Sequence, residues 1–407
     1  MRGSNERNQI TGRNTVMLYL DHAATTAVHP EVTKEMEPYM GEVYANPSGV
    51  YTFSEDTREM IEKVRQKAAE SIRAYPDEIY FTSGGTEADN WALIGAAEGL
   101  YEKGKHIITS GIEHHAILRT CEYLEKRGFS VTYLPVDSSG KVLVDQIKEA
   151  IRPDTILISI MFANNEIGTI EPIQEIGTLA GQHNILFHTD AVQAYLHENI
   201  DVKAMKIDML SVSSHKFQGP KGVGFLYVRR GVGLPSFMHG GGQERGRRAG
   251  TENVAGIVGM GKAIAIGMNQ AKERHAHLCA MRDFLIEQIA QKIPYCRING
   301  SQQNRLDNNV NVSFRYLEGE SLIILLDLEG ICVSGGSACS SSEKGVSYVL
   351  QEIGLSEEWA RGTIRISLGV ENTMEQMQYF VQRLSYLVEQ LRQFSDEYLK
   401  LNKTDIP

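Results

Sequence analysis

The 407-residue chain lacks the features of a membrane protein, a nucleic-acid-binding protein or a disulfide-rich scaffold. No apolar run approaches the ~20 residues of a membrane-spanning helix. The net charge is −10, so there is no general basic footprint for nucleic acid. The five cysteines are an odd number without a C-x-x-C pair, which argues against a disulfide framework or a zinc ribbon. We therefore expect a cytoplasmic protein that binds neither membranes nor nucleic acid directly.

Length and composition fit a globular protein with one large and one smaller domain. The chain is 42% hydrophobic and 23% charged, which is ordinary for this class. Residues 1–16 are polar, lack the apolar core of a signal peptide, and predict a flexible N-terminal tail. A glycine-rich stretch at 239–242 precedes a long helical pattern. We place the domain boundary in or after that helix, giving a large domain at 17–265 and a small C-terminal domain at 266–407.

Strand-like and helix-like patterns alternate along most of the chain. In the large domain, short apolar or β-branched runs occur at 78–82, 106–109, 131–134, 155–160, 185–188, 209–212 and 222–228. This alternation predicts an α/β fold with a mostly parallel seven-stranded sheet flanked by helices, in which the last run pairs antiparallel. The small domain is expected to be α+β, with strands at 309–314 and 363–368. An apolar stripe on the last helix, from Thr373, is expected to be core packing.

Lys216 is the most informative residue of the large domain. It closes the run Val212-Ser213-Ser214-His215-Lys216 and precedes a glycine-rich turn. A lysine in this setting can form an imine with the aldehyde of pyridoxal phosphate (PLP). Ser213 and His215 are donors suited to the phosphate of that cofactor. The alternative is a solvated lysine before a turn.

Two further segments that follow predicted strands suit the same cofactor, because ligands collect at the carboxyl ends of parallel strands. Gly85 and Thr86 open a helix whose first N–H groups and dipole attract a phosphate. The alternative is a capping turn with Ser83 or Thr86 as N-cap. Asp190 could pair with the pyridinium nitrogen, and Gln193 could reach the ring hydroxyl. Asp190 could instead be a helix N-cap.

His114 and Asn165 also follow predicted strands. An imidazole at His114 could stack on a flat cofactor and move protons. The amide of Asn165 could hold a ring hydroxyl or a substrate carboxylate. A structural histidine and a simple turn would explain each of them alone. Five such signals at successive strand ends, in an order that makes one site, favour a PLP enzyme.

This set of motifs resembles the class V aminotransferase family of fold-type I PLP enzymes. The segments Tyr19–Thr26 and Gln243–Asn253 are similar to that family as well, and the resemblance runs from about residue 18 to 395. It implies these cofactor-binding residues: Gly85, Thr86, His114, Asn165, Asp190, Gln193, Ser213, His215, Lys216 and Thr251. Thr251 would come from a partner subunit, which implies a homodimer with shared sites.

The resemblance also implies that Asn165 and Arg365 bind the substrate carboxylate. An arginine suits a carboxylate because its guanidinium can grip both oxygens. Arg365 lies in the predicted strand at 363–368. Without the resemblance, a surface arginine on that strand would be the simpler interpretation.

Cys339 differs from the other cysteines. Its segment, 333–342, is small, polar and glycine-rich, which predicts a mobile, exposed loop of the small domain. A thiol in such a loop is placed to react. We interpret the remaining cysteines as structural thiols: Cys121, Cys279, Cys296 and Cys332. The Ser-Gly-Gly-Ser-Ala-Cys-Ser-Ser pattern resembles the persulfide loop of group I cysteine desulfurases, the NifS/IscS-like enzymes. An incidental loop cysteine is the alternative.

The resemblance implies a PLP-dependent conversion of L-cysteine to L-alanine without a metal, in which Lys216, His114 and Cys339 are catalytic. The sulfur would pass as a persulfide on Cys339 to an acceptor such as an iron–sulfur scaffold or a tRNA-thiolation enzyme. A selenocysteine lyase is the first alternative. A transaminase would need no thiol, and a non-enzymatic sulfur-carrier scaffold would need no Lys216.

The sequence departs from the family pattern in two places. Tyr51 stands where relatives commonly have histidine, so the local role of that histidine is in doubt. The tail at 398–407 does not resemble the extension with which housekeeping members meet an iron–sulfur scaffold. The sequence therefore leaves the identity of the acceptor open.

Overall fold

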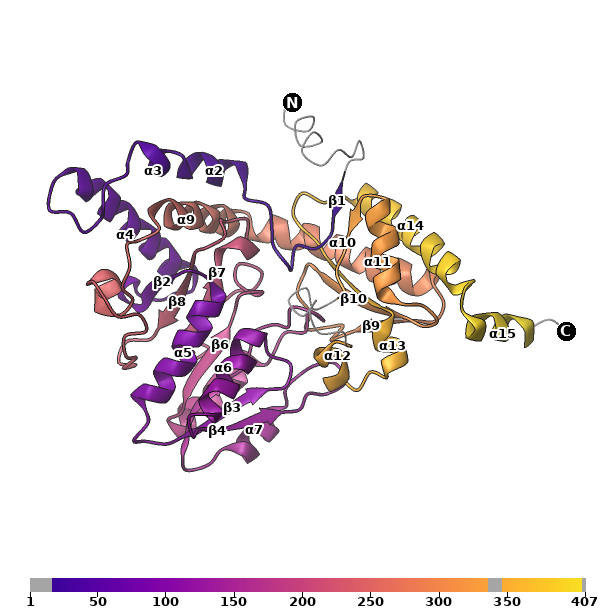
Figure 1. Ribbon diagram of the computed structural model, residues 1–407, viewed down its shortest axis with the longest axis horizontal. Helices are drawn as coiled ribbons and strands as arrows, with labels where there is room; N and C mark the ends of the chain where they lie inside the picture. Colours follow the sequence, from indigo (N-terminus) through magenta and orange to yellow (C-terminus); the bar gives the residue numbers. More distant parts are fainter. Residues whose placement is uncertain (1–16, 336–345, 405–407) are drawn as a thin grey trace.

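The computed structural model describes residues 17–335 and 346–404, and Figure 1 shows their arrangement. The segment 1–16, for which we predicted a flexible tail, lies outside the described residues, as does Cys339. In the described ranges, no helix combines the length and the apolar character needed to cross a bilayer.

A seven-stranded sheet forms the centre of the larger part of the molecule. Its strand order is β2-β8-β7-β6-β5-β3-β4. The strands are β2 (Ile79–Thr82), β3 (His106–Ser110), β4 (Ser130–Leu134), β5 (Thr155–Ser159), β6 (Leu186–Asp190), β7 (Met209–Ser213) and β8 (Gly224–Val228). Strand β8 is antiparallel to both of its neighbours, so the other six strands share one direction. The prediction of a mostly parallel sheet with an antiparallel last run is confirmed.

Helices cover both faces of this sheet (Figure 1). They include α4 (Phe53–Ser71), α5 (Gly85–Gly99), α6 (His115–Glu125), α7 (Val144–Ala150), α8 (Ile173–His183) and α9 (Val254–Asn269). Neighbouring strand residues point to opposite faces. Accordingly, Ile158 packs in the core under α4, α8 and α9, whereas Leu157 packs under α5 and α6. Burial on both faces explains why the strands are nearly continuous apolar runs.

A second core lies beyond α9. It contains the antiparallel sheet β12-β10-β9, with β9 (Cys296–Asn299), β10 (Asn309–Phe314) and β12 (Thr363–Ser367). The helices around it include α10 (Ala271–Lys292), α11 (Gly319–Leu328) and α14 (Met374–Arg392). The apolar stripe of α14 is buried there, which confirms core packing. Three short helices complete this part: α12 (Tyr348–Glu352), α13 (Glu357–Arg361) and α15 (Asp396–Thr404).

The start of the chain lies with the second core. Strand β1 (Leu18–Tyr19) pairs parallel with β11 (Ile331–Cys332), and Leu18 and Leu20 are buried in that core. The chain then crosses to the large sheet through α2 (Pro30–Met36) and α3 (Pro38–Gly41). The domain boundary near residue 265, which would fall inside α9, remains a prediction.

Candidate active site

Most of the predicted site residues lie around one cavity at the carboxyl edge of the large sheet. We call it the active-site cavity; it holds about 1090 Å³ of empty space, part of it open to solvent. The predicted residues that line it are Gly85, Thr86, His114, Asn165, Asp190, Gln193, Ser213, His215, Lys216 and Arg365. Thr251 does not line it. Thr251 is exposed and borders a separate depression beside Tyr44 and Asn46.

The N-terminus of α5 faces the active-site cavity. The N-cap residue is Gly84, and no side chain of the described residues caps this helix end. The alternative of a side-chain N-cap at Ser83 or Thr86 is therefore wrong. A Cβ atom at Gly85 would lie 2.6 Å from Cγ2 of Val192, so the close approach of the two segments requires glycine there. The first N–H groups of α5 are thus available to an anion.

Ser213 and His215 border the same end of the site. A shallower depression that adjoins the cavity is lined by Gly85, Thr86 and both of these residues. Burial lowers the pKa of His215 to about 4, so its imidazole is neutral near pH 7. A neutral imidazole and a hydroxyl beside a helix N-terminus make a donor set for a phosphate.

Lys216 follows β7 and contacts the N-terminal segment of the chain. Its Nζ donates hydrogen bonds to the carbonyl oxygens of Ala23, at 2.6 Å, and Ala24, at 2.9 Å. Nε2 of Gln193 donates to the same Ala23 oxygen at 3.0 Å. The segment at 19–26, singled out in the sequence by its family likeness, therefore forms part of the wall around Lys216.

Asp190 ends β6 and is buried, with 6% of its surface exposed. Its Oδ1 accepts a hydrogen bond from the Val192 N–H at 2.9 Å. Burial raises the pKa of Asp190, whereas the nearby His114 and Lys216 lower it. A cationic ligand beside this carboxylate would offset the cost of burying its charge.

His114 is the N-cap of α6, where its Nδ1 accepts a hydrogen bond from the Ala116 N–H at 3.1 Å. The ring proton therefore sits on Nε2 in the neutral form. Burial is the largest influence on this imidazole and lowers its pKa. His114 thus has a structural role as a cap and also presents its ring to the cavity.

Arg365 is buried, with 2% of its surface exposed, so the alternative of a surface arginine is wrong. Its Nη2 lies 2.7 Å from Oδ1 of Asp21, and its Nη1 donates to the Asn165 carbonyl at 3.1 Å. In the described part of the chain, Oδ1 of Asn165 is buried without a hydrogen-bond partner. The two residues predicted to bind a carboxylate are thus neighbours.

The structure adds cavity-lining residues that sequence analysis did not single out, among them Asp89, His115, Glu166 and Tyr348. Asp89 lies one helical turn after Gly85, a spacing that places both on one face of α5. Tyr348 carries no comparable signal, because it reaches the site from α12, far along the chain. Its hydroxyl donates to the Glu113 carbonyl at 2.5 Å.

Both ends of the segment that contains Cys339 are attached to the cavity wall. Before it, the Ser334 N–H donates to the Arg365 carbonyl at 3.1 Å. After it, the Ser347 hydroxyl donates to Oε2 of Glu166 at 2.6 Å. Glu166 and Arg365 line the active-site cavity, so Ser334 and Ser347, which flank the segment of Cys339, are held at its wall.

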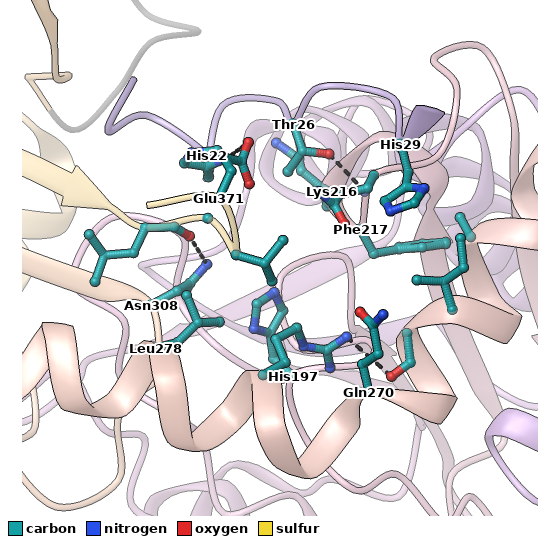
Figure 2. Close-up of a pocket in the computed structure, with 18 residues that line it drawn as sticks. His22, Thr26, His29, His197, Lys216, Phe217, Gln270, Leu278, Asn308 and Glu371 are labelled. Carbon is teal, nitrogen blue, oxygen red and sulfur yellow. Dashed lines mark hydrogen bonds and ion pairs between the residues drawn. The ribbon is translucent and has the colours of Figure 1, made fainter. Parts of the chain in front are cut away.

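Lys216 also lines a second cavity, which Figure 2 shows. It has about 560 Å³ of empty space, and its wall includes His22, His197, Phe217 and Glu371. Nδ1 of His22 lies 3.9 Å from Oε1 of Glu371. Of the described residues predicted to bind cofactor or substrate, Lys216 alone borders this space. The donor set for a phosphate and a pyridinium ring therefore belongs to the active-site cavity.

The chain is similar in sequence to several known proteins. It matches the family model described as Aminotransferase class-V over residues 18–380. It is 52% identical over 388 residues to the cysteine desulfurase IscS of Clostridium botulinum (strain Hall), covering 94% of this chain and 98% of that relative.

Two solved structures extend the similarity to the fold. A NifS-like protein has a TM-score of 0.87 and 38% identity, covering 92% of this chain and 100% of that one. A structure described as SspA in complex with cysteine has a TM-score of 0.77 and 40% identity, covering 86% of this chain and 98% of that one.

Proposed function

The chain belongs to the class-V aminotransferase family and is a PLP-dependent cysteine desulfurase with L-cysteine as substrate, and we propose that it transfers the sulfur through a persulfide on Cys339. One observation carries the proposal. Lys216, His114 and Asp190 meet in one cavity, and the segment that contains Cys339 starts and ends at the wall of that cavity.

The residues of the active-site cavity fit PLP. The uncapped N-terminus of α5, with Ser213 and His215, suits the phosphate. The buried carboxylate of Asp190 suits the pyridinium nitrogen. When bound, the cofactor supplies a ring that withdraws electrons from the α-carbon of an amino acid. We assign to Gln193 a hydrogen bond with the ring hydroxyl, and to His114 stacking on the ring face.

We assign to Lys216 the covalent attachment of the cofactor and the transfer of the substrate's α-proton. The carbonyl groups of Ala23 and Ala24 hold its Nζ at the cavity wall. His114 is the second candidate for proton transfer, since its lowered pKa leaves a neutral imidazole near pH 7.

We assign the binding of the substrate carboxylate to Arg365 and Asn165. The guanidinium of Arg365 is buried, and a charge-assisted hydrogen bond is stronger in such surroundings than in water. Asp21 holds one edge of that guanidinium and fixes its orientation. The orphaned Oδ1 of Asn165 shows that its amide has hydrogen-bonding capacity to spare among the described residues.

In the proposed sulfur transfer, the thiolate of Cys339 attacks the sulfur of L-cysteine. The carbon–sulfur bond breaks, a sulfur–sulfur bond forms, and a proton on the former sulfur-bearing carbon completes L-alanine. Cys339 lies four residues beyond Gly335, and four residues span at most ~14 Å. Ser334 is hydrogen-bonded to the backbone of Arg365, so the chain enters the segment of Cys339 beside a residue that we assign to the substrate.

We infer a homodimer in which Thr251 completes the site of the partner. Thr251 is exposed and remote from the active-site cavity of its own chain. Beside it, Tyr44 is 75% exposed, and Val50, in the same segment between α3 and α4, is 99% exposed. Large exposed apolar side chains next to a residue with a predicted ligand role favour a second copy as the occupant of this face.

We infer that an acceptor protein, an iron–sulfur scaffold or a tRNA-thiolation enzyme, takes the sulfur from Cys339. The cytoplasm is the proposed location, since the four described cysteines are free thiols, as a reducing compartment requires.

Mass spectrometry of the Cys339 peptide tests the persulfide. The PLP-loaded protein, treated with L-cysteine and alkylated without a reducing agent, should gain one sulfur atom on Cys339. The Cys279 peptide of the same digest is the control and should gain none. A sulfur found on another cysteine, or on none, would contradict the assignment. A parallel assay with selenocysteine tests the alternative substrate.

A mixed-dimer experiment tests the shared site. Lys216→Ala and Thr251→Val chains are each expected to be impaired as homodimers. If Thr251 serves the partner's site, a mixed dimer has one site with Lys216 and Thr251 both intact, and mixing restores activity. If Thr251 serves its own chain, mixing restores nothing.

A further inference from the structure

Asp89 is a buried acid at the active-site cavity that the mechanism above does not use. It lies in the first half of α5, lines the cavity, and has 1% of its surface exposed. Its Oδ1 is buried, and no hydrogen-bond partner for it exists among the described residues. A buried carboxyl oxygen without a hydrogen bond costs free energy, so its presence at a ligand cavity calls for a ligand-related reason.

His188, whose ring lies beside Asp89, cannot neutralise a charge on it. Nε2 of His188 lies 3.7 Å from Oδ1 of Asp89. The ring is fully buried between Ser159 and Ser211, whose hydroxyl oxygens lie 2.9 and 3.0 Å from its two nitrogens. Burial lowers the pKa of His188 to about 3, so the ring is neutral near pH 7.

Asp89 and Asp190 are two buried carboxyls in one small space. One side-chain atom from each of Asp89, Asp190 and His114 lies within 4.8 Å of the other two. Two carboxyls this close do not both ionise readily in a low dielectric, so the pair shares one proton in the absence of a cation.

The surroundings decide which carboxyl holds that proton. Asp190 accepts a hydrogen bond from the Val192 N–H, and the nearby His114 and Lys216 also favour its ionised form. Asp89 faces Asp190 and His188 on β6 and the acidic Glu113 before α6. Burial and the charge of Asp190 raise its pKa, and the Ser211 hydroxyl opposes them only in part. Asp190 is thus the ionised member and Asp89 the protonated one.

We propose that Asp89 is a positioning residue that acts through Asp190: as the cofactor binds, the proton that the two carboxyls share goes to the ring nitrogen of PLP at Asp190. The ring nitrogen gains the proton that Asp89 loses, and the new cation then lies beside two carboxylates instead of one. This inference rests on the proposed placement of the ring nitrogen at Asp190. It explains why a carboxyl with one unpartnered oxygen is kept at this cavity.

The test is the affinity of the apoenzyme for PLP, measured by fluorescence quenching at about pH 6.5 and about pH 8.5. At the lower pH the ring nitrogen brings its own proton, so Asp89→Asn should bind PLP as tightly as the parent. At the higher pH the variant lacks the internal proton donor, and its affinity should fall relative to the parent by about 10-fold or more. Glu98→Gln, at an exposed position on α5, is the matched control and should follow the parent at both pH values.

Equal affinities of Asp89→Asn and the parent at both pH values would overturn the inference. Failure of the parent to bind PLP at either pH would overturn the proposed function together with it. If the variant does not fold, infrared difference spectra of the parent decide the matter. PLP binding should remove one protonated-carboxyl band, and an unchanged carboxyl region would overturn the proposal.

Discussion

Replacing Glu113 by glutamine should make the protein more stable than the parent, and the difference should grow as the pH rises. Glu113 precedes His114 and has no exposed surface. Its Oε1 accepts hydrogen bonds from the Ser110 hydroxyl at 2.6 Å and the Met161 N–H at 3.0 Å. Its Oε2 has no partner among the described residues. Burial raises the pKa of this carboxyl from 4.5 to about 8, so the folded protein holds it protonated near pH 7.

The sign and size of the effect follow from linkage. The pKa of Glu113 is raised on folding, so its contribution to stability is fully present below the unfolded pKa and is lost as the pH rises to about 8. At pH 7 the loss spans about 2.5 pH units, which is about 3 kcal/mol. Glutamine keeps the Oε1 acceptor and resembles the protonated acid, and it does not titrate. Glu113→Gln should therefore exceed the parent's free energy of unfolding by less than about 1 kcal/mol near pH 5 and by about 3 kcal/mol at pH 7.

Urea unfolding of apo parent and variant, from about pH 5 to about pH 8, measures this difference. Glu102→Gln, at an exposed position without the burial that shifts Glu113, is the control. Its free energy of unfolding should differ from that of the parent by the same small amount at every pH. A difference between Glu113→Gln and the parent that does not grow with pH would refute the reasoning.

Three further variants address the site. Lys216→Ala should lose the visible absorbance of the covalently bound cofactor on gel filtration, and retention of that band would rule out Lys216 as the attachment point. Cys339→Ala should keep the band but lose turnover of L-cysteine by a factor on the order of 10³ or more, and normal turnover would exclude the persulfide route. Arg365→Lys should raise KM for L-cysteine about 10- to 100-fold with a smaller change in kcat, because a charge-assisted contact to the carboxylate weakens. An unchanged KM would place the carboxylate elsewhere.

The large sheet was predictable because its strands are buried on both faces and so stand out as short apolar runs. The site followed from the same pattern, since Asp190, Lys216 and His114 each come directly after one of those runs. Strand β1 was not predictable, because two residues that pair with β11 more than 300 positions away leave no local signal. Its pairing places the start of the chain against the second core, which the sequence pattern does not reveal.

Other parts of the site depend on contacts that a single sequence pattern does not encode. Tyr348 reaches Glu113 from α12, across 235 positions of sequence. Asp89 lies one helical turn after Gly85, and only its burial beside Asp190 gives it significance. Thr251 lies away from the cavity of its own chain, so its predicted role depends on a second copy.

The most direct test of the central claim is the stoichiometry of products from L-cysteine. The purified, PLP-loaded protein is incubated with L-cysteine and a reducing thiol, and sulfide and alanine are both quantified. Our account predicts equal amounts of the two, with Lys216→Ala producing neither. Alanine without sulfide, pyruvate in place of alanine, or no reaction by the loaded protein would contradict it.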